Sequence, residues 1–336
     1  MVFEPAYLRL FKSGELAERV RVAYQHLEDC DLCAHHCGVN RRVTLQGTAC
    51  RTGERAVVSS YNPHFGEEAP LVGRGGSGTI FLAWCNLRCE YCQNYEISQL
   101  GDPSTPLRTG PSTPLRTGPS TPLRASGSEV EPEELAALML RLQSMGCHNI
   151  NFVSPSHVVA PIVAATLIAA HAGLRLPIVY NTGGYDSPQA LALLDGVVDI
   201  YMPDVKYADA EIARKYSKIR DYPGVNRAAV KEMHRQVGDL AVDVCGVATR
   251  GLLVRHLILP NDLAGTRQTL QWLAEEISPN TYLNLMDQYR PCYKARDHPE
   301  LNRRITREEF TRAVLWAEEF GLTRLDERVP VRLVGL

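Results

Sequence analysis

The sequence predicts an α/β fold in which six parallel strands, separated mostly by helices, form an open partial (β/α)6 barrel. From residue 79 onwards, short apolar runs alternate with longer helical patterns, as expected for parallel strands joined by right-handed crossovers. Six such units are too few for a closed eight-stranded barrel. The chain of 336 residues is long enough for this unit and for smaller flanking parts.

The predicted elements follow in order along the chain. The first strand, residues 79–84, comes directly before a cysteine-rich loop. Five further strands are expected at residues 149–153, 176–180, 198–202, 252–259 and 281–285. Helices are expected at residues 132–145, 158–172, 187–194, 224–237, 266–277 and 307–320. Pro132 suits the first turn of its helix, and Thr306 is a suitable N-cap for the last one.

The elements suggest three parts of unequal size. Residues 1–75 are expected to form an N-terminal helix and a small cysteine-rich metal-binding lobe, residues 76–291 the barrel, and residues 292–336 a C-terminal helical extension. An eight-residue repeat with two prolines per unit lies within residues 101–128 and cannot build a helix or a central strand. It predicts a flexible surface insertion, either a tether for a partner or an expansion that the loop tolerates.

Composition narrows the class of protein. Apolar residues make up 45% of the chain and the net charge is −2, so binding to nucleic acid is not indicated. Residues 1–20 do not form a signal peptide, and the longest apolar stretch, 158–170, is too short to cross a membrane. We therefore expect a cytoplasmic protein whose ten cysteines are metal ligands or free thiols. The isolated cysteines are expected to be small core residues: Cys147, Cys245 and Cys292.

A loop after the first predicted strand carries Cys85, Cys89 and Cys92 with the spacing C-x3-C-x2-C. Three thiolates on one short loop can bind three irons of a [4Fe–4S] cluster and leave the fourth iron open to a substrate or cofactor. The alternative is a structural zinc site, which requires a fourth ligand that is missing locally.

With Tyr91 directly before its third cysteine, this motif resembles the signature of the radical S-adenosylmethionine (SAM) enzymes. The resemblance implies a partial barrel, a cluster whose open iron binds the amino and carboxylate groups of SAM, and cleavage of SAM to a 5′-deoxyadenosyl radical. It also implies an electron donor of the flavodoxin or ferredoxin type.

A second set of cysteines precedes the first, with the spacing C-x2-C-x3-C-x12-C: Cys30, Cys33, Cys37 and Cys50. Four thiolates suit either tetrahedral zinc or an iron–sulfur cluster, and the sequence leaves both open. Zinc would stabilise the small lobe, whereas a cluster could relay electrons or bind a substrate.

Polar residues at the predicted strand ends lie where an α/β barrel places its chemistry. Asp204 and Lys206 share one face of an extended chain and could hold the charged methionine end of SAM, or form a surface ion pair. Arg255 interrupts an apolar strand, so it is expected to face a polar cavity and meet the SAM carboxylate, or to form a structural ion pair.

Within the superfamily, the chain resembles the enzymes that activate pyruvate formate-lyase, in the segments Asn181-Thr182-Gly183-Gly184 and Met202-Pro203-Asp204-Val205-Lys206. The resemblance implies that Tyr91 contacts adenine. It also implies that Asn181, Thr182, Met202 and Asp204 hold a monovalent cation at the cofactor site. A Gly-Gly-Glu motif is replaced here by Ser154-Pro155-Ser156-His157, so Ser154 or backbone carbonyls would meet the SAM amino group. The whole chain, including its N-terminal lobe, looks like the pyruvate formate-lyase activating enzyme-like subgroup.

These observations predict a radical SAM oxidoreductase with three alternatives for its role. The first substrate is a protein glycine, with a glycyl-radical enzyme as partner. The second is a small molecule, a peptide or another macromolecule, contacted by Gln288, Tyr289 and Arg290. The third alternative is a non-catalytic iron–sulfur or zinc protein that acts as a sensor.

Overall fold

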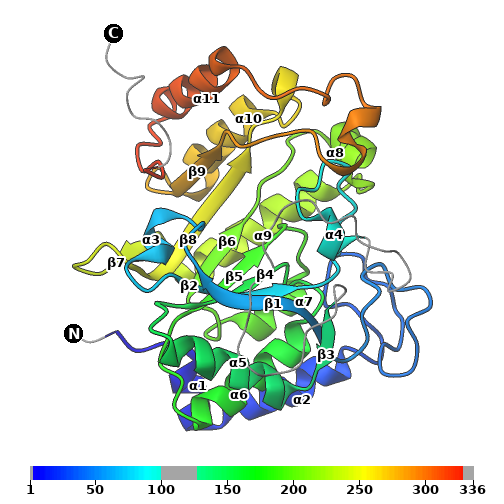
Figure 1. Ribbon diagram of the computed structural model, residues 1–336, viewed down its shortest axis with the longest axis vertical. Helices are drawn as coiled ribbons and strands as arrows, with labels where there is room; N and C mark the ends of the chain where they lie inside the picture. Colours follow the sequence, from blue (N-terminus) through cyan, green and yellow to red (C-terminus); the bar gives the residue numbers. More distant parts are fainter. Residues whose placement is uncertain (1–2, 100–126, 328–336) are drawn as a thin grey trace.

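The computed structural model describes residues 3–99 and 127–327, which fold around one central sheet of nine strands (Figure 1). The strands follow the order β3-β1-β2-β4-β5-β6-β8-β7, and β9 also pairs with β8. Their bounds are β1 Ala56–His64, β2 Ser77–Leu82, β3 Ser128–Val130, β4 Ile150–Val153, β5 Ile178–Thr182, β6 Ile200–Pro203, β7 Ala241–Val242, β8 Ala248–Leu257 and β9 Tyr282–Met286.

Six of these strands are parallel and pair in chain order: β2, β4, β5, β6, β8 and β9. This mostly parallel sheet confirms the predicted α/β class and the predicted series of parallel strands. Strands β1, β3 and β7 pair antiparallel and were not expected from the sequence. Strand β5 also extends beyond its apolar run, because Asn181 and Thr182 continue the ladder opposite Met202 and Pro203.

Helices cover the sheet and connect its strands, with bounds α1 Tyr7–Ser13, α2 Glu15–Gln25, α3 Ala69–Val72, α4 Tyr95–Ser98, α5 Pro132–Ser144, α6 Val159–His171, α7 Pro188–Leu194, α8 Ala210–Ser217, α9 Tyr222–Val237, α10 Thr266–Trp272 and α11 Arg307–Glu319. Helices α1, α2, α5 and α6 lie together along one side, and α10 and α11 lie near β9 (Figure 1). Helix α6 is apolar on every face, which suits its burial among these neighbours. Helix α10 ends at Trp272, earlier than predicted, and a π-helical turn continues to Ile277.

The short helix α3 packs against one face of the sheet. Leu71 is fully buried and packs in one cluster with Val179, Ile200 and Leu253, which come from three different strands. The side chain of Asn149 donates a hydrogen bond to the carbonyl of Leu71 at 2.9 Å. The part of this segment around Leu71 is therefore packed into the core.

The structure tests the predictions for Cys147 and Cys245, but not the prediction for the Pro-rich insertion. The Pro-rich insertion predicted at residues 101–128 lies almost wholly in residues 100–126, outside the described residues. Cys147 is buried as expected, but Cys245 is exposed because it lies in the turn between β7 and β8. Within residues 3–99 and 127–327, no helix is both long and apolar enough to cross a membrane.

Candidate active site at the strand ends

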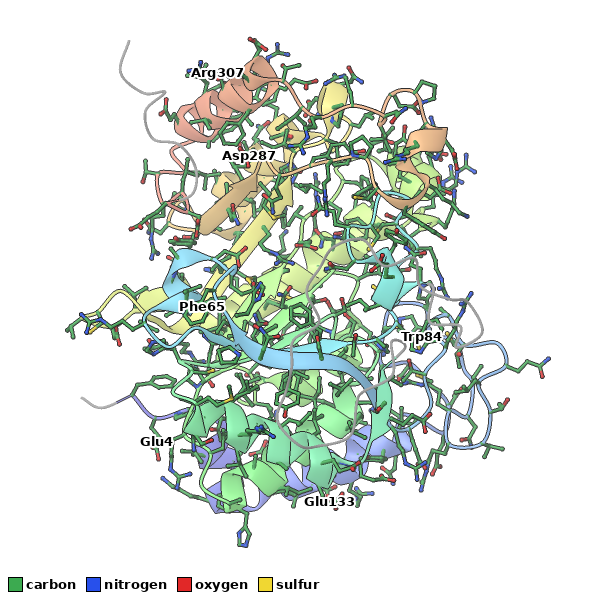
Figure 2. The ribbon with its side chains drawn as sticks, viewed as in Figure 1. Glu4, Phe65, Trp84, Glu133, Asp287 and Arg307 are labelled. Carbon is green, nitrogen blue, oxygen red and sulfur yellow. The ribbon has the colours of Figure 1, made fainter. Side chains whose placement is uncertain are left out.

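The three-cysteine loop leaves β2 and is fixed by hydrogen bonds to its backbone and side chains. Trp84, labelled in Figure 2, turns the chain out of the strand with a positive φ of 68°. The side chain of Asn86 donates to the carbonyl of Tyr185 at 2.8 Å, and the side chain of Gln99 donates to the carbonyl of Cys89 at 2.9 Å. The loop is therefore held against the ends of the parallel strands.

One cavity of about 250 Å³ brings the predicted site residues together. Its walls include the three thiols and all six residues predicted to contact the cofactor: Cys85, Cys89, Cys92, Tyr91, Ser154, Asn181, Asp204, Lys206 and Arg255. These residues come from the cysteine loop and from the ends of β4, β5, β6 and β8. Their roles as ligands stay predictions, but the prediction that they share one place is matched by the geometry.

Burial dominates the protonation of the thiols in this cavity. It raises the pKa of Cys85 to about 12 and the pKa of Cys89 to about 11. The Lys206 ammonium opposes both shifts, because a nearby positive charge favours the thiolate. A lysine is thus already placed where it would stabilise thiolate ligands.

Asp204 lies between two cations. Lys206 Nζ donates to Asp204 Oδ2 at 2.6 Å, and Arg255 Nε donates to Asp204 Oδ1 at 2.8 Å. A second guanidinium nitrogen of Arg255 donates to the side-chain oxygen of Asn181 at 2.8 Å. Although burial opposes ionisation, Arg255 and Lys206 together hold the pKa of Asp204 below its ordinary value. The sequence left two alternatives for Arg255, a place in a polar cavity or a structural ion pair. The structure shows both, because Arg255 lines the cavity and pairs with Asp204.

Two residues that the sequence did not single out support this group from α9. The Tyr222 hydroxyl lies 2.9 Å from the carbonyls of Gly183 and Asp204 and accepts from the backbone N–H of Lys206 at 3.1 Å. The side chain of Asn226 donates to the carbonyls of Gly184 and Asp204, at 3.0 Å each. The signal for Asn226 was weak, because a polar residue within an amphipathic helix usually faces solvent.

Tyr91 combines burial with access to the cavity. Its ring packs edge-on against Tyr207 and Tyr289, with ring centres 6.2 and 6.1 Å away. Ser154 follows β4 with a positive φ of 61°, and its backbone N–H donates to the carbonyl of Asn181 at 2.9 Å. Tyr91 is thus positioned by ring packing, and Ser154 is positioned by a backbone hydrogen bond. Gln288 also lines the cavity, whereas Tyr289 is buried and its hydroxyl donates to the carbonyl of Leu301 at 2.7 Å.

His157, next to the Ser154 turn, is fully buried, and its Nε2 lies 3.0 Å from the carbonyl oxygen of Ala83. Burial, with a contribution from Arg41, lowers its pKa to about 3. Since the unfolded chain binds a proton at a pKa near 6.5, acid favours the unfolded state throughout the interval from about 6.5 down to about 3.

We expect His157→Gln to reduce the loss of unfolding free energy that occurs as the pH falls below about 6.5. Between pH 6.5 and pH 4.5, the buried imidazole should cost the wild type about 2 to 3 kcal/mol of unfolding free energy that the variant does not lose. Urea denaturation of both proteins at the two pH values measures the difference. Carboxylates contribute equally to both proteins, so identical pH dependence in wild type and variant would contradict the prediction.

The four N-terminal cysteines lie in the turn-rich segment between α2 and β1, where Cys30, Cys33 and Cys50 are buried and Cys37 is partly exposed. Burial raises the pKa of Cys33, and the charges of Cys50, Cys30 and Cys37 raise it further. The guanidinium of Arg41 donates to Cys30 Sγ at 3.5 Å. Although burial opposes the charge on Arg41, these thiols keep its pKa raised.

The N-terminal lobe contacts the three-cysteine loop directly. His35 Nε2 donates to the carbonyl of Asn86 at 2.6 Å, and Arg88 donates to the carbonyl of Ala49. The Arg51 guanidinium lies over the Trp84 ring, 5.3 Å from its centre. The two sets of cysteines therefore belong to adjoining parts of one structure.

The sequence profile of the radical SAM superfamily matches residues 79–263, which is more than half of the chain. The chain belongs to the radical SAM superfamily. It is also similar to an uncharacterized protein of Methanocaldococcus jannaschii, with 30% identity over 317 residues. That alignment covers 94% of this chain and 82% of the relative, so the likeness extends beyond the radical SAM region.

Membership implies a [4Fe–4S] cluster and SAM as cofactors, and the donor set of this radical SAM protein fits them. In the described parts of the chain, no three or more Cys, His, Asp or Glu side chains form a group that could hold a metal ion. A [4Fe–4S] cluster makes a different demand, because each thiolate binds its own iron. Three thiols around one cavity, with cations beside them, suit such a cluster and an anionic carboxylate.

Proposed function

We propose that Cys85, Cys89 and Cys92 hold the cluster and that the surrounding strand ends hold SAM, as in a radical SAM enzyme that abstracts hydrogen from a bound substrate. One observation carries this proposal. Three thiols and six cofactor contacts, predicted from separate parts of the sequence, line the same cavity. Such convergence at the carboxyl ends of parallel strands is typical of active sites in α/β enzymes.

When bound and reduced, the cluster supplies the electron that cleaves SAM to a 5′-deoxyadenosyl radical. The protein's own residues bind and orient. Lys206 and Arg255 present positive charge to the SAM carboxylate, and Asp204 holds both cations in place. Tyr91 provides an aromatic wall for adenine, and the buried residues of the loop, Asn86, Leu87 and Cys89, limit the access of water to the reacting groups.

We also propose that the sheet curls into the partial barrel of the radical SAM type. Support comes from the segment after β1, which reaches the opposite edge of the parallel series. The side chain of Asn284 on β9 donates to Glu68 at 2.9 Å, while β1 itself pairs with β2. The first and last parallel strands are therefore bridged by one short segment.

Activation of a glycyl-radical enzyme, with a flavodoxin or ferredoxin as electron donor, is a finer form of this proposal. It is favoured by the segments that resemble pyruvate formate-lyase activating enzymes, since Asn181, Asp204 and Lys206 all line the cavity. Formation of a glycyl radical on an added partner, followed by electron paramagnetic resonance, tests this form separately.

The decisive experiment is anaerobic reconstitution with iron and sulfide, followed by reduction with dithionite in the presence of SAM. We expect 5′-deoxyadenosine from the wild type and none above background from Cys85→Ala. Cys245→Ala, which removes an exposed thiol far along the sequence, is the matched control and should keep its product. An intact, reducible cluster in a protein that neither binds SAM nor forms 5′-deoxyadenosine would contradict the proposal and favour the sensor role.

A further inference from the structure

A second hollow of about 650 Å³ adjoins the thiol cavity. Six residues line both spaces: Asn94, Val153, Asn181, Arg255, Met286 and Gln288. The hollow lies between the segment after β1 and the end of β9. In Figure 2, Phe65 marks the segment after β1 and Asp287 marks the end of β9. A molecule in this hollow would therefore lie next to whatever fills the thiol cavity.

The walls of this second hollow are acidic. Glu67, Glu68 and Asp287 contribute carboxylates, and Asn284 contributes an amide. Among the described residues that line it, Arg255 is the one permanent cation, and its guanidinium already donates to Asp204 and Asn181. The hollow is therefore unsuited to an anion and suited to a molecule that carries positive charge.

Glu68 is the best-placed of these carboxylates. It is 3% exposed, and its Oε1 accepts from the Asn284 side chain at 2.9 Å. The Arg255 guanidinium lies 3.9 Å from the same oxygen, Oε1. Among the described residues, its second oxygen, Oε2, has no hydrogen-bond partner. A buried carboxylate oxygen without a donor is costly, and such exceptions call for an explanation.

The position of Glu68 is fixed by its neighbours on both sides. The next residue, Ala69, donates its backbone N–H to Asp326 at 3.1 Å. Leu71, three residues on, is fully buried against residues of β5, β6 and β8. These contacts hold the backbone next to Glu68, and Asn284 holds its Oε1, so the free oxygen is a preorganised acceptor.

We infer that the second hollow is the substrate site and that Glu68 binds a positively charged nitrogen of the substrate, a protonated amine or a guanidinium. This inference rests on the proposed function and assigns a substrate class to the same site. A carboxylate oxygen only accepts hydrogen bonds, and a charged N–H donor compensates a buried carboxylate best. The source of the nitrogen is either a small amine or a lysine or arginine side chain of a peptide.

Binding to the reconstituted holoenzyme with SAM present tests the inference. Calorimetry would compare the butylammonium ion with its neutral counterpart, 1-butanol. It would also compare the peptide acetyl-Ala-Lys-Ala-amide with the same peptide carrying norleucine. We expect the charged member of at least one pair to bind about tenfold or more tightly than the neutral one, and Glu68→Gln to remove that preference. Glu133→Gln on the exposed face of α5, labelled in Figure 2, should keep it.

The outcomes separate the alternatives. Preference for the lysine peptide alone supports a protein substrate, and preference for butylammonium supports a small amine. Equal binding of charged and neutral ligands by the unmodified protein overturns the inference, without relying on a variant that has to fold. Weakened SAM binding in Glu68→Gln would also overturn it, because Glu68 would then serve the amino group of SAM. Absence of 5′-deoxyadenosine with intact charge preference would instead locate the failure in the proposed function.

Discussion

Replacing Asp204 by asparagine is expected to lower the free energy of unfolding by about 3 to 5 kcal/mol, because two largely buried cations lose the carboxylate that both of them contact. Asparagine preserves the shape of the side chain but removes the negative charge that Lys206 and Arg255 share at 2.6 and 2.8 Å. These two cations would then repel each other in a site that is only 14 to 18% exposed. Urea denaturation at neutral pH measures the loss.

Neutral pH suits that measurement, because Asp204 is ionised there in both the folded and the unfolded protein. Because the pKa of folded Asp204 is lowered, its contribution is fully present above the pKa of an unfolded aspartate and is lost only as acid protonates the folded carboxylate. Glu211→Gln is the control, since Glu211 pairs with Arg214 and Arg220 at a side chain that is 51% exposed. This change should cost less than about 1 kcal/mol. Equal losses in the two variants would mean that the group around Asp204 behaves as a surface ion pair.

Arg41→Lys should produce the second large effect, a loss of about 2 to 4 kcal/mol. The buried guanidinium donates to three carbonyls, those of Thr52 and Gly53 at 2.8 Å each and that of His157 at 2.7 Å. The first two acceptors belong to the N-terminal lobe, whereas His157 follows β4. A lysine ammonium cannot reach the same three acceptors from one plane, so buried carbonyls lose their donors.

The chain offers a matched control in the adjacent residue. Arg42 is 47% exposed and pairs with Glu28 and Glu54 at the surface, each at 3.2 Å. Arg42→Lys should therefore change the unfolding free energy by no more than about 0.5 kcal/mol. Thermal unfolding of both variants, prepared with the same metal content, makes the comparison. Similar midpoints for Arg41→Lys and wild type would show that the lobe does not depend on this arginine.

The series of parallel strands was predictable because apolar runs and helical periods alternate from residue 79 onwards. Strand β1 was missed because its sequence, Ala-Val-Val-Ser-Ser-Tyr-Asn-Pro-His, has little apolar alternation and most of its residues are only partly buried. Helix α8 was missed for its shortness, although Asp209 is an N-cap that accepts from Glu211 and Ile212 and could have marked its start.

The walls of the cavity were predictable where polarity conflicts with secondary structure. Arg255 within an apolar strand and Asp204 at a strand end are costly unless a polar space receives them, and both line it. Glu68 and Asn284 were beyond reach, because they are 216 positions apart in the chain and only the folded sheet brings them into contact. Tyr222 and Asn226 act through backbone carbonyls, which leave no trace in a side-chain pattern.

The short segment that carries Glu68 and Leu71 lies outside the region that matches the radical SAM profile, and the second hollow depends on it. It precedes the first parallel strand, and yet it forms a wall of the second hollow and packs Leu71 against the sheet. A shortened chain that started at the radical SAM region would keep the thiols but lose this wall. If the second hollow is the substrate site, the residues that hold the cluster and the residues that select the substrate lie in separate stretches of chain, 85–92 and 64–68.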